Sequence, residues 1–192
     1  MSRGIISIFG GSSPRPGSLA YQEAYLLGES LAQAGYTVMT GGYSGTMEAA
    51  SKGARAAGGH VIGVTVGLFA QAGLSPNPWV AEEIRYETLN ERLLHLVTAC
   101  DGAVALRGGV GTLSEVAMTW SLLQVGEMPL KPFLLVGKGW TRVFETYRAE
   151  SYVNGERDMA LIQFVDTVTD VAPALAAWFE NPPRPSSRLG GG

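Results

Sequence analysis

The chain reads Ala103-Val-Ala-Leu-Arg-Gly-Gly-Val-Gly-Thr-Leu-Ser-Glu115 across its middle, and this stretch decides the fold. Residues 104–106 form a short apolar run, which is typical of a buried strand in a parallel sheet. Three glycines follow within four positions, and glycine lets backbone N–H groups approach a ligand with no Cβ in the way. The stretch therefore predicts a strand, a glycine turn and the start of a helix.

The start of this helix is the predicted anion site. Thr112 and Glu115 have the spacing of a capping box, with Thr112 at the N-cap. A helix N-terminus behind a glycine loop offers free N–H groups and a favourable dipole to a phosphate. The loop is neither a Walker A motif, because no Gly-Lys-Ser/Thr follows, nor a dinucleotide fingerprint, because Ser114 stands where the third glycine belongs. The predicted phosphate-binding residues are Gly108, Gly109, Val110, Gly111 and Thr112.

Strand and helix patterns alternate along the rest of the chain. Strands are expected at 5–9, 36–40, 60–65, 103–106, 133–136 and 161–165. Helices are expected at 18–33, 48–57, 82–98, 113–125, 141–150 and 171–179. This alternation predicts an α/β fold, a single Rossmann-like, doubly wound domain with a mainly parallel sheet. We expect one domain over residues 1–180 and a flexible tail over 181–192, which ends in three glycines.

Two further loops are expected at the same edge of the sheet, because ligands in such folds lie beyond the carboxyl ends of the strands. They follow the first and second predicted strands, at 10–13 and 41–48. Their predicted nucleotide-binding residues are Gly11, Ser12, Ser13, Gly41, Gly42, Gly45, Thr46 and Glu48. Two simpler interpretations stay open: a tight turn at 10–13, and for Glu48 an interaction with the helix dipole worth about 0.3–1 kcal/mol. The connection at 67–80 is either a rim of the pocket or a disordered loop.

Composition excludes several classes of function. A net charge of −3 without a basic cluster argues against a nucleic-acid partner. One cysteine, Cys100, excludes a disulfide framework and favours a reducing compartment. No apolar run approaches the roughly 20 residues that cross a membrane, and no signal segment is recognisable, so we expect a cytoplasmic protein without a membrane partner. We expect neither a metal site nor a cofactor.

The Gly-Gly-x-Gly-Thr-x-x-Glu pattern at 108–115 resembles the signature of the LOG family, nucleoside 5′-monophosphate phosphoribohydrolases often mislabelled as possible lysine decarboxylases. The family pattern begins with Pro, where this chain has Arg107. The family also carries Glu-Arg-Lys nine residues before an Asp-Ala-Phe strand start. Here Glu91-Arg92-Leu93 stands at that distance from Asp101, so the arginine matches and the lysine does not.

The resemblance implies an enzyme that cleaves an N-glycosidic bond, releasing free base and ribose 5-phosphate. It implies catalytic roles for Arg92 and Glu115, a nucleotide-like small-molecule ligand, and a homodimer or higher homo-oligomer. The residues alone also allow Arg92 to be a surface side chain and Glu115 to be only a cap. A lysine decarboxylase is not expected, because it needs a lysine that binds pyridoxal phosphate, and none of Lys52, Lys131 and Lys138 lies in the glycine loops at 10–13, 41–48 and 107–115.

A binding protein is the alternative class. The LOG-like fold is similar to that of molybdenum-cofactor carrier proteins, which bind a pterin phosphate without converting it. Arg107 for Pro, Leu93 for Lys, and Glu48 for Gly depart from the LOG pattern and keep this alternative open.

Overall fold

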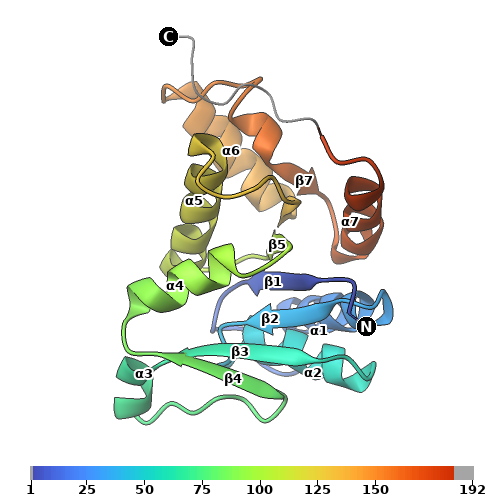
Figure 1. Ribbon diagram of the computed structural model, residues 1–192, viewed down its shortest axis with the longest axis vertical. Helices are drawn as coiled ribbons and strands as arrows, with labels where there is room; N and C mark the ends of the chain where they lie inside the picture. Colours follow the sequence, from blue (N-terminus) through green and yellow to red (C-terminus); the bar gives the residue numbers. More distant parts are fainter. Residues whose placement is uncertain (1, 184–192) are drawn as a thin grey trace.

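Seven parallel strands form one sheet in the computed structural model, which describes residues 2–183 (Figure 1). The strands are β1 (Ile5–Phe9), β2 (Thr37–Thr40), β3 (Val61–Val66), β4 (Glu82–Tyr86), β5 (Gly102–Ala105), β6 (Phe133–Val136) and β7 (Gln163–Val165). Their order in the sheet is β4-β3-β2-β1-β5-β6-β7. The predicted α/β fold with a parallel sheet is thereby confirmed. Most of the predicted tail, residues 184–192, lies outside the described residues.

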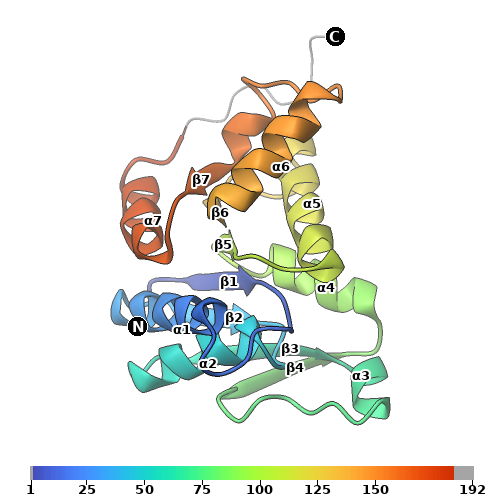
Figure 2. The ribbon, with the colours of Figure 1, turned by 180° about the vertical axis from the view of Figure 1, so that it is seen from behind.

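Helices cover both faces of the sheet (Figures 1 and 2). They are α1 (Leu19–Gln33), α2 (Thr46–Ala56), α3 (Gly67–Gln71), α4 (Leu89–Thr98), α5 (Val110–Val125), α6 (Lys138–Ala149) and α7 (Val171–Glu180), with 3-10 turns η1 (Met159–Leu161) and η2 (Val168–Asp170). Successive strand residues belong to different cores: Val38 belongs to the core that includes residues of α1, α2 and α7, whereas Met39 belongs to the core that includes residues of α4, α5 and α6. This alternation is the period of two expected of a strand that is buried on both faces.

The direction of winding reverses at β1. Strands β2 to β4 lie on one side of it and β5 to β7 on the other, with β1 and β5 paired directly, from Ile6 opposite Gly102 to Phe9 opposite Ala105. Such a switch point opens a crevice at the carboxyl ends of the strands. The glycine loops after β1 and β5 flank that crevice.

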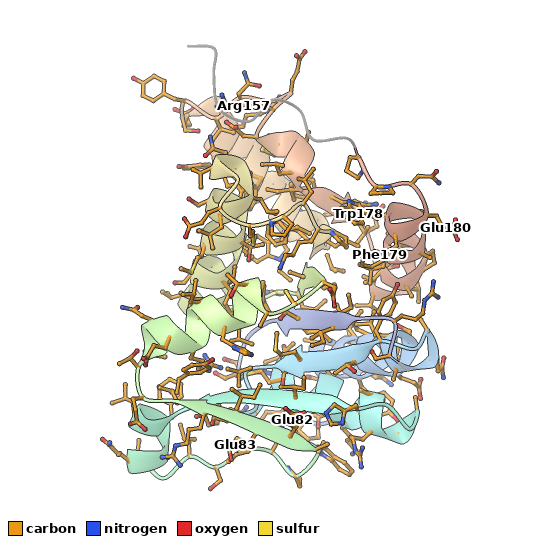
Figure 3. All side chains as sticks on the ribbon, in the orientation of Figure 1. Glu82, Glu83, Arg157, Trp178, Phe179 and Glu180 are labelled. Carbon is orange, nitrogen blue, oxygen red and sulfur yellow. The ribbon has the colours of Figure 1, made fainter. Side chains whose placement is uncertain are left out.

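The helix predicted at 82–98 is wrong. Residues 82–86 form β4, which pairs with β3 at the edge of the sheet, and only Leu89–Thr98 is helical. Glu82 and Glu83 lie on this edge strand (Figure 3), where Glu82 contacts His60 at 2.9 Å. Thr88 and Glu91 form a capping box at the start of α4, so Thr88 is the boundary between β4 and this helix.

Residues 67–80 do not form one long loop, and hydrogen bonds attach them to the loop after β2. It begins with the short helix α3 and then crosses to Asn77, which is buried. The Asn77 side-chain amide donates hydrogen bonds to the carbonyl oxygens of Gly42 and Tyr43, at 2.9 and 3.0 Å. The connection therefore holds the loop after β2 in place.

Candidate functional site

Three glycine loops meet at the carboxyl edge of the sheet, as the sequence predicts. The N–H of Gly11 donates to the carbonyl of Arg107 at 3.3 Å, which joins the loops after β1 and β5. The N–H of Thr46 donates to the carbonyl of Gly11 at 2.9 Å, which joins the loops after β1 and β2. Ser12 and Ser13 lie exposed at the rim of this group. The three predicted loops are thus held next to one another by backbone hydrogen bonds.

Two of the loops are built alike. Thr46 lies beneath Gly10, and Thr112 lies beneath Gly108, and a Cβ on either glycine would collide with the threonine side chain. Both threonines are almost fully buried, at 1% and 3% exposure. The two threonine side chains therefore support the loops from inside.

The predicted capping box at Thr112 and Glu115 is wrong, because α5 starts three residues earlier. Its N-cap is Gly109, and Thr112 is the third helical residue. Val110 and Gly111 of the glycine loop already have helical backbone geometry, so the helix begins before Thr112. The N–H groups of Val110, Gly111 and Thr112, in the first turn, have no partner within the helix, as at every α-helix start.

Gly109 and Gly111 leave this first turn open. Neither has a positive φ, and a Cβ on either would meet no atom within 4 Å. Backbone conformation and packing therefore do not require glycine at these positions, in contrast to Gly108. The exposed turn has the geometry of an anion site, with N–H groups and the positive end of a helix dipole.

Arg92 extends from α4 to β3 and to the loop after β2. Its Nε donates to the carbonyl of Val64 at 2.7 Å and its Nη2 to the carbonyl of Gly41 at 3.1 Å. The guanidinium also lies over the ring of Tyr43, 5.7 Å from its centroid. A Cβ at position 41 would collide with Nη2, so Gly41 makes room for this arginine. Burial lowers the pKa of Arg92, and the charge of Glu115 opposes that shift.

Glu115 lies on α5, which packs against α4, and its side chain is partly buried. Burial raises the pKa of Glu115 from 4.5 to about 7, and the positive charge of Arg92 limits this rise. Within residues 2–183 the ion pairs closer than 4.0 Å are His60–Glu82 and Arg157–Asp158, so Arg92 and Glu115 interact over a longer distance. A carboxyl group that exchanges its proton near neutral pH beside a fixed cation is suited to acid–base chemistry.

Glu48 has a partner inside the protein. Its carboxylate accepts a hydrogen bond from the hydroxyl of Tyr21 at 3.2 Å, which ties α2 to α1. Burial, followed by the charge of Glu48, raises the pKa of Tyr21. The structure thus directs Glu48 towards α1, whereas Arg92 and Glu115 belong to the helices on the other face.

Tyr43 is a site residue that the sequence analysis missed. It lies beneath the Arg92 guanidinium, and its hydroxyl accepts a hydrogen bond from the N–H of Val66 at 3.0 Å. The signal in the sequence was an aromatic residue directly after Gly41 and Gly42, at the end of a predicted strand.

Comparisons with known proteins agree with this architecture. A family model, the SLOG cluster4 family, matches residues 3–125. A cytokinin riboside 5′-monophosphate phosphoribohydrolase of Mycobacterium tuberculosis is 30% identical over 180 residues, covering 89% of this chain and 92% of that protein. The probable phosphoribohydrolase LOGL5 of Oryza sativa subsp. japonica is 31% identical over 137 residues, or 65% of this chain, which spans about half (52%) of the rice protein.

Solved structures show the same fold. The molybdenum cofactor binding protein of Rippkaea orientalis superposes with a TM-score of 0.74 at 24% identity, over 93% of this chain and 99% of that one. Among the helices of residues 2–183, none has both the length and the apolar character needed to cross a bilayer. From the family match over most of its length, the chain belongs to the SLOG cluster4 family.

Proposed function

We propose that the protein hydrolyses the N-glycosidic bond of a nucleoside 5′-monophosphate to free base and ribose 5-phosphate. The observation that carries the proposal is Glu115, a carboxyl group with a pKa of about 7 beside Arg92 and on the helix that starts at the anion loop. The named activity of the mycobacterial relative supports the same reaction class.

The phosphate is held by the first turn of α5. The N–H groups of Val110, Gly111 and Thr112 bind its oxygens, and the open positions at Gly109 and Gly111 admit it. Gly11, from the loop after β1, lies against Arg107 and Gly108 and forms the neighbouring wall. Anchoring the phosphate there holds the ribose over the crevice, where the positions of the reacting groups are fixed before reaction.

Bond cleavage builds positive charge on the ribose ring, as in glycoside hydrolysis. The Glu115 carboxylate stabilises this charge and orients a water molecule towards the anomeric carbon. The water oxygen forms the new bond to that carbon, the carbon–nitrogen bond breaks, and the proton that the water loses ends on the nitrogen of the leaving base. Arg92 keeps part of Glu115 ionised at neutral pH, since its charge favours the carboxylate.

A panel of nucleoside monophosphates tests the reaction by release of free base. Wild type is compared with Glu115→Gln and with Glu127→Gln, which makes the same change at an exposed residue just beyond α5. We expect turnover in wild type and in Glu127→Gln, and a steep loss in Glu115→Gln. Calorimetry with AMP and adenosine tests the phosphate site separately, and equal affinities would contradict it.

A second candidate is a carrier that binds a pterin phosphate without converting it. The Rippkaea protein of the same fold is a molybdenum cofactor binding protein, which supports this class. Arg107 also favours it, because this residue adds an exposed positive charge directly before the anion loop, where the LOG pattern has proline. Absence of base release across the whole panel would move the proposal to this class. For either candidate we propose a cytoplasmic homodimer or higher homo-oligomer, which light scattering after gel filtration tests.

A further inference from the structure

Tyr43 fills the space on one side of the Arg92 guanidinium. Only 6% of the tyrosine surface is exposed, and the centroid of its ring lies 5.7 Å from the guanidinium carbon. The other printed partners of this guanidinium are backbone oxygens, those of Val64 and Gly41 at 2.7 and 3.1 Å. A cation near an aromatic face is attracted to it, and the ring also limits where the cation can lie.

The tyrosine ring is itself fixed at three points. Its hydroxyl accepts a hydrogen bond from the N–H of Val66 at 3.0 Å and donates one to the carbonyl of the same residue at 3.3 Å. The ring meets Phe69 of α3 edge to face, with 5.3 Å between the centroids. Its backbone carbonyl accepts a hydrogen bond from the buried Asn77 amide at 3.0 Å. Tyr43 is therefore a rigid support.

This support lies on the side of Arg92 that is opposite to Glu115. In both views α4, which carries Arg92, lies between α5 and α3 (Figures 1 and 2). Glu115 belongs to α5, whereas Tyr43 packs against Phe69 of α3. Removing the tyrosine ring therefore opens space into which the guanidinium can move away from the carboxyl group.

The other titratable groups around Glu115 are engaged elsewhere or exposed. The helix α5 packs against α4, β1 and η1, and it meets α6 through Trp120 and Phe144. β1 has no charged residue. On or beside α4 and η1, the partners are Thr88 for Glu91, Tyr86 for His95 and Arg157 for Asp158. The charged groups of α6 and of the loop before α5 are exposed: Lys138, Arg142, Glu145, Arg148 and Arg107.

We propose that Tyr43 is a positioning residue of the hydrolase site, which holds the Arg92 guanidinium where its charge acts on Glu115. The proposal rests on the proposed function, because it concerns the same arginine and the same glutamate. Without the ring, the guanidinium moves into the vacated space and water enters beside it. Both changes weaken the effect of the positive charge on the carboxyl group, so the pKa of Glu115 rises.

Tyr43→Leu tests this without any need for turnover. Carbon NMR of protein labelled at the glutamate carboxyl carbons measures the pKa of Glu115, and Glu115→Gln identifies its signal. We expect the variant to raise this pKa by about one unit. Tyr36→Leu is the matched control, because Tyr36 is 3% exposed and has the Arg3 guanidinium 5.7 Å from its ring, in the other core. It should leave the pKa of Glu115 unchanged.

Base release gives the second measurement. With a pKa one unit higher, turnover of Tyr43→Leu should fall about fivefold at pH 7 and return to nearly the wild-type value by pH 9, because only the ionised fraction of Glu115 changes. KM should stay at the wild-type value, since the phosphate binds the first turn of α5. Tyr43→Phe keeps the ring beneath the guanidinium and should restore both the pKa and the pH profile.

Phe69→Leu keeps the test valid if Tyr43→Leu does not fold. Phe69 is partly exposed and contacts the tyrosine ring, so its loss should raise the pKa of Glu115 by a smaller amount. An unchanged pKa in the folded variant, an equal rise in Tyr36→Leu, or turnover lost equally at every pH would overturn the positioning role and leave the hydrolase proposal standing. Absence of base release in the wild type would instead end the hydrolase proposal, and the NMR titration would still decide whether Tyr43 positions Arg92.

Discussion

Replacing Glu115 by Gln should stabilise the protein at alkaline pH. The pKa of Glu115 rises from 4.5 to about 7 on folding, chiefly through burial. The folded chain therefore binds this proton more tightly than the unfolded chain, and the stability present below pH 4.5 is lost as the pH rises through about 7. At 1.36 kcal/mol for each pKa unit, the loss in free energy of unfolding reaches about 3 kcal/mol by pH 8.

Gln cannot ionise, so the variant escapes this loss. Its free energy of unfolding should match the wild-type value near pH 4.5 and exceed it by up to about 3 kcal/mol at pH 8. Urea denaturation at pH 4.5, 6, 7 and 8 measures the difference, with Glu127→Gln as the control for an exposed carboxylate. A difference that does not change with pH would refute the assignment of Glu115 as a buried, weakly acidic group.

The same variant tests catalysis. Loss of the carboxylate should lower base release ten- to a hundredfold at pH 8, equivalent to about 1.4–2.8 kcal/mol of barrier. If Glu115→Gln is more stable than the wild type but inactive, the Glu115 carboxylate is needed for the reaction although it lowers the free energy of unfolding. Unaltered turnover in that stable variant would end the catalytic assignment.

Three further predictions concern other features. Gly111→Ala should weaken AMP binding at least tenfold and leave the melting temperature nearly unchanged, because its Cβ meets no protein atom; equal AMP affinity by calorimetry would contradict the anion site. Lys131→Met should lower the free energy of unfolding by about 3 kcal/mol, measured in urea, because the buried Lys131 ammonium donates hydrogen bonds to the carbonyls of Val97, Thr98 and Cys100 at the end of α4. In the wild type, base release should rise with pH and level off above about 7, since the active form of Glu115 is the carboxylate; a profile that falls across pH 7 would instead indicate that the protonated form acts.

The sequence was sufficient for the fold and for the grouping of the glycine loops. Alternating strand and helix patterns specify a doubly wound sheet, and in such a sheet the ends of neighbouring parallel strands meet at one edge. The error at 82–98 has a local cause: Ile84, Leu89 and Leu93 fit the spacing of a helix, but pairing with β3 recruits 82–86 as an edge strand. The capping pair Thr88 and Glu91, visible in the sequence, marked the true helix start.

The electrostatics of the site could not be predicted in the same way. The pKa of Glu115 depends on how α4 and α5 pack, and sequence spacing does not reveal that depth of burial. The contacts of Arg92 with Val64 and Gly41 join residues 28 and 51 positions apart.

The hydrogen bonds from Arg92 to two backbone carbonyls have a consequence for affinity. A free arginine side chain carries about 2 kcal/mol of rotamer entropy, which is lost when a ligand immobilises it. In this protein the Arg92 side chain has already lost its rotamer freedom on folding, because hydrogen bonds to the carbonyls of Val64 and Gly41 hold the guanidinium in place. The Arg92 guanidinium is therefore pre-organised, and binding of a ligand to it costs little further side-chain entropy.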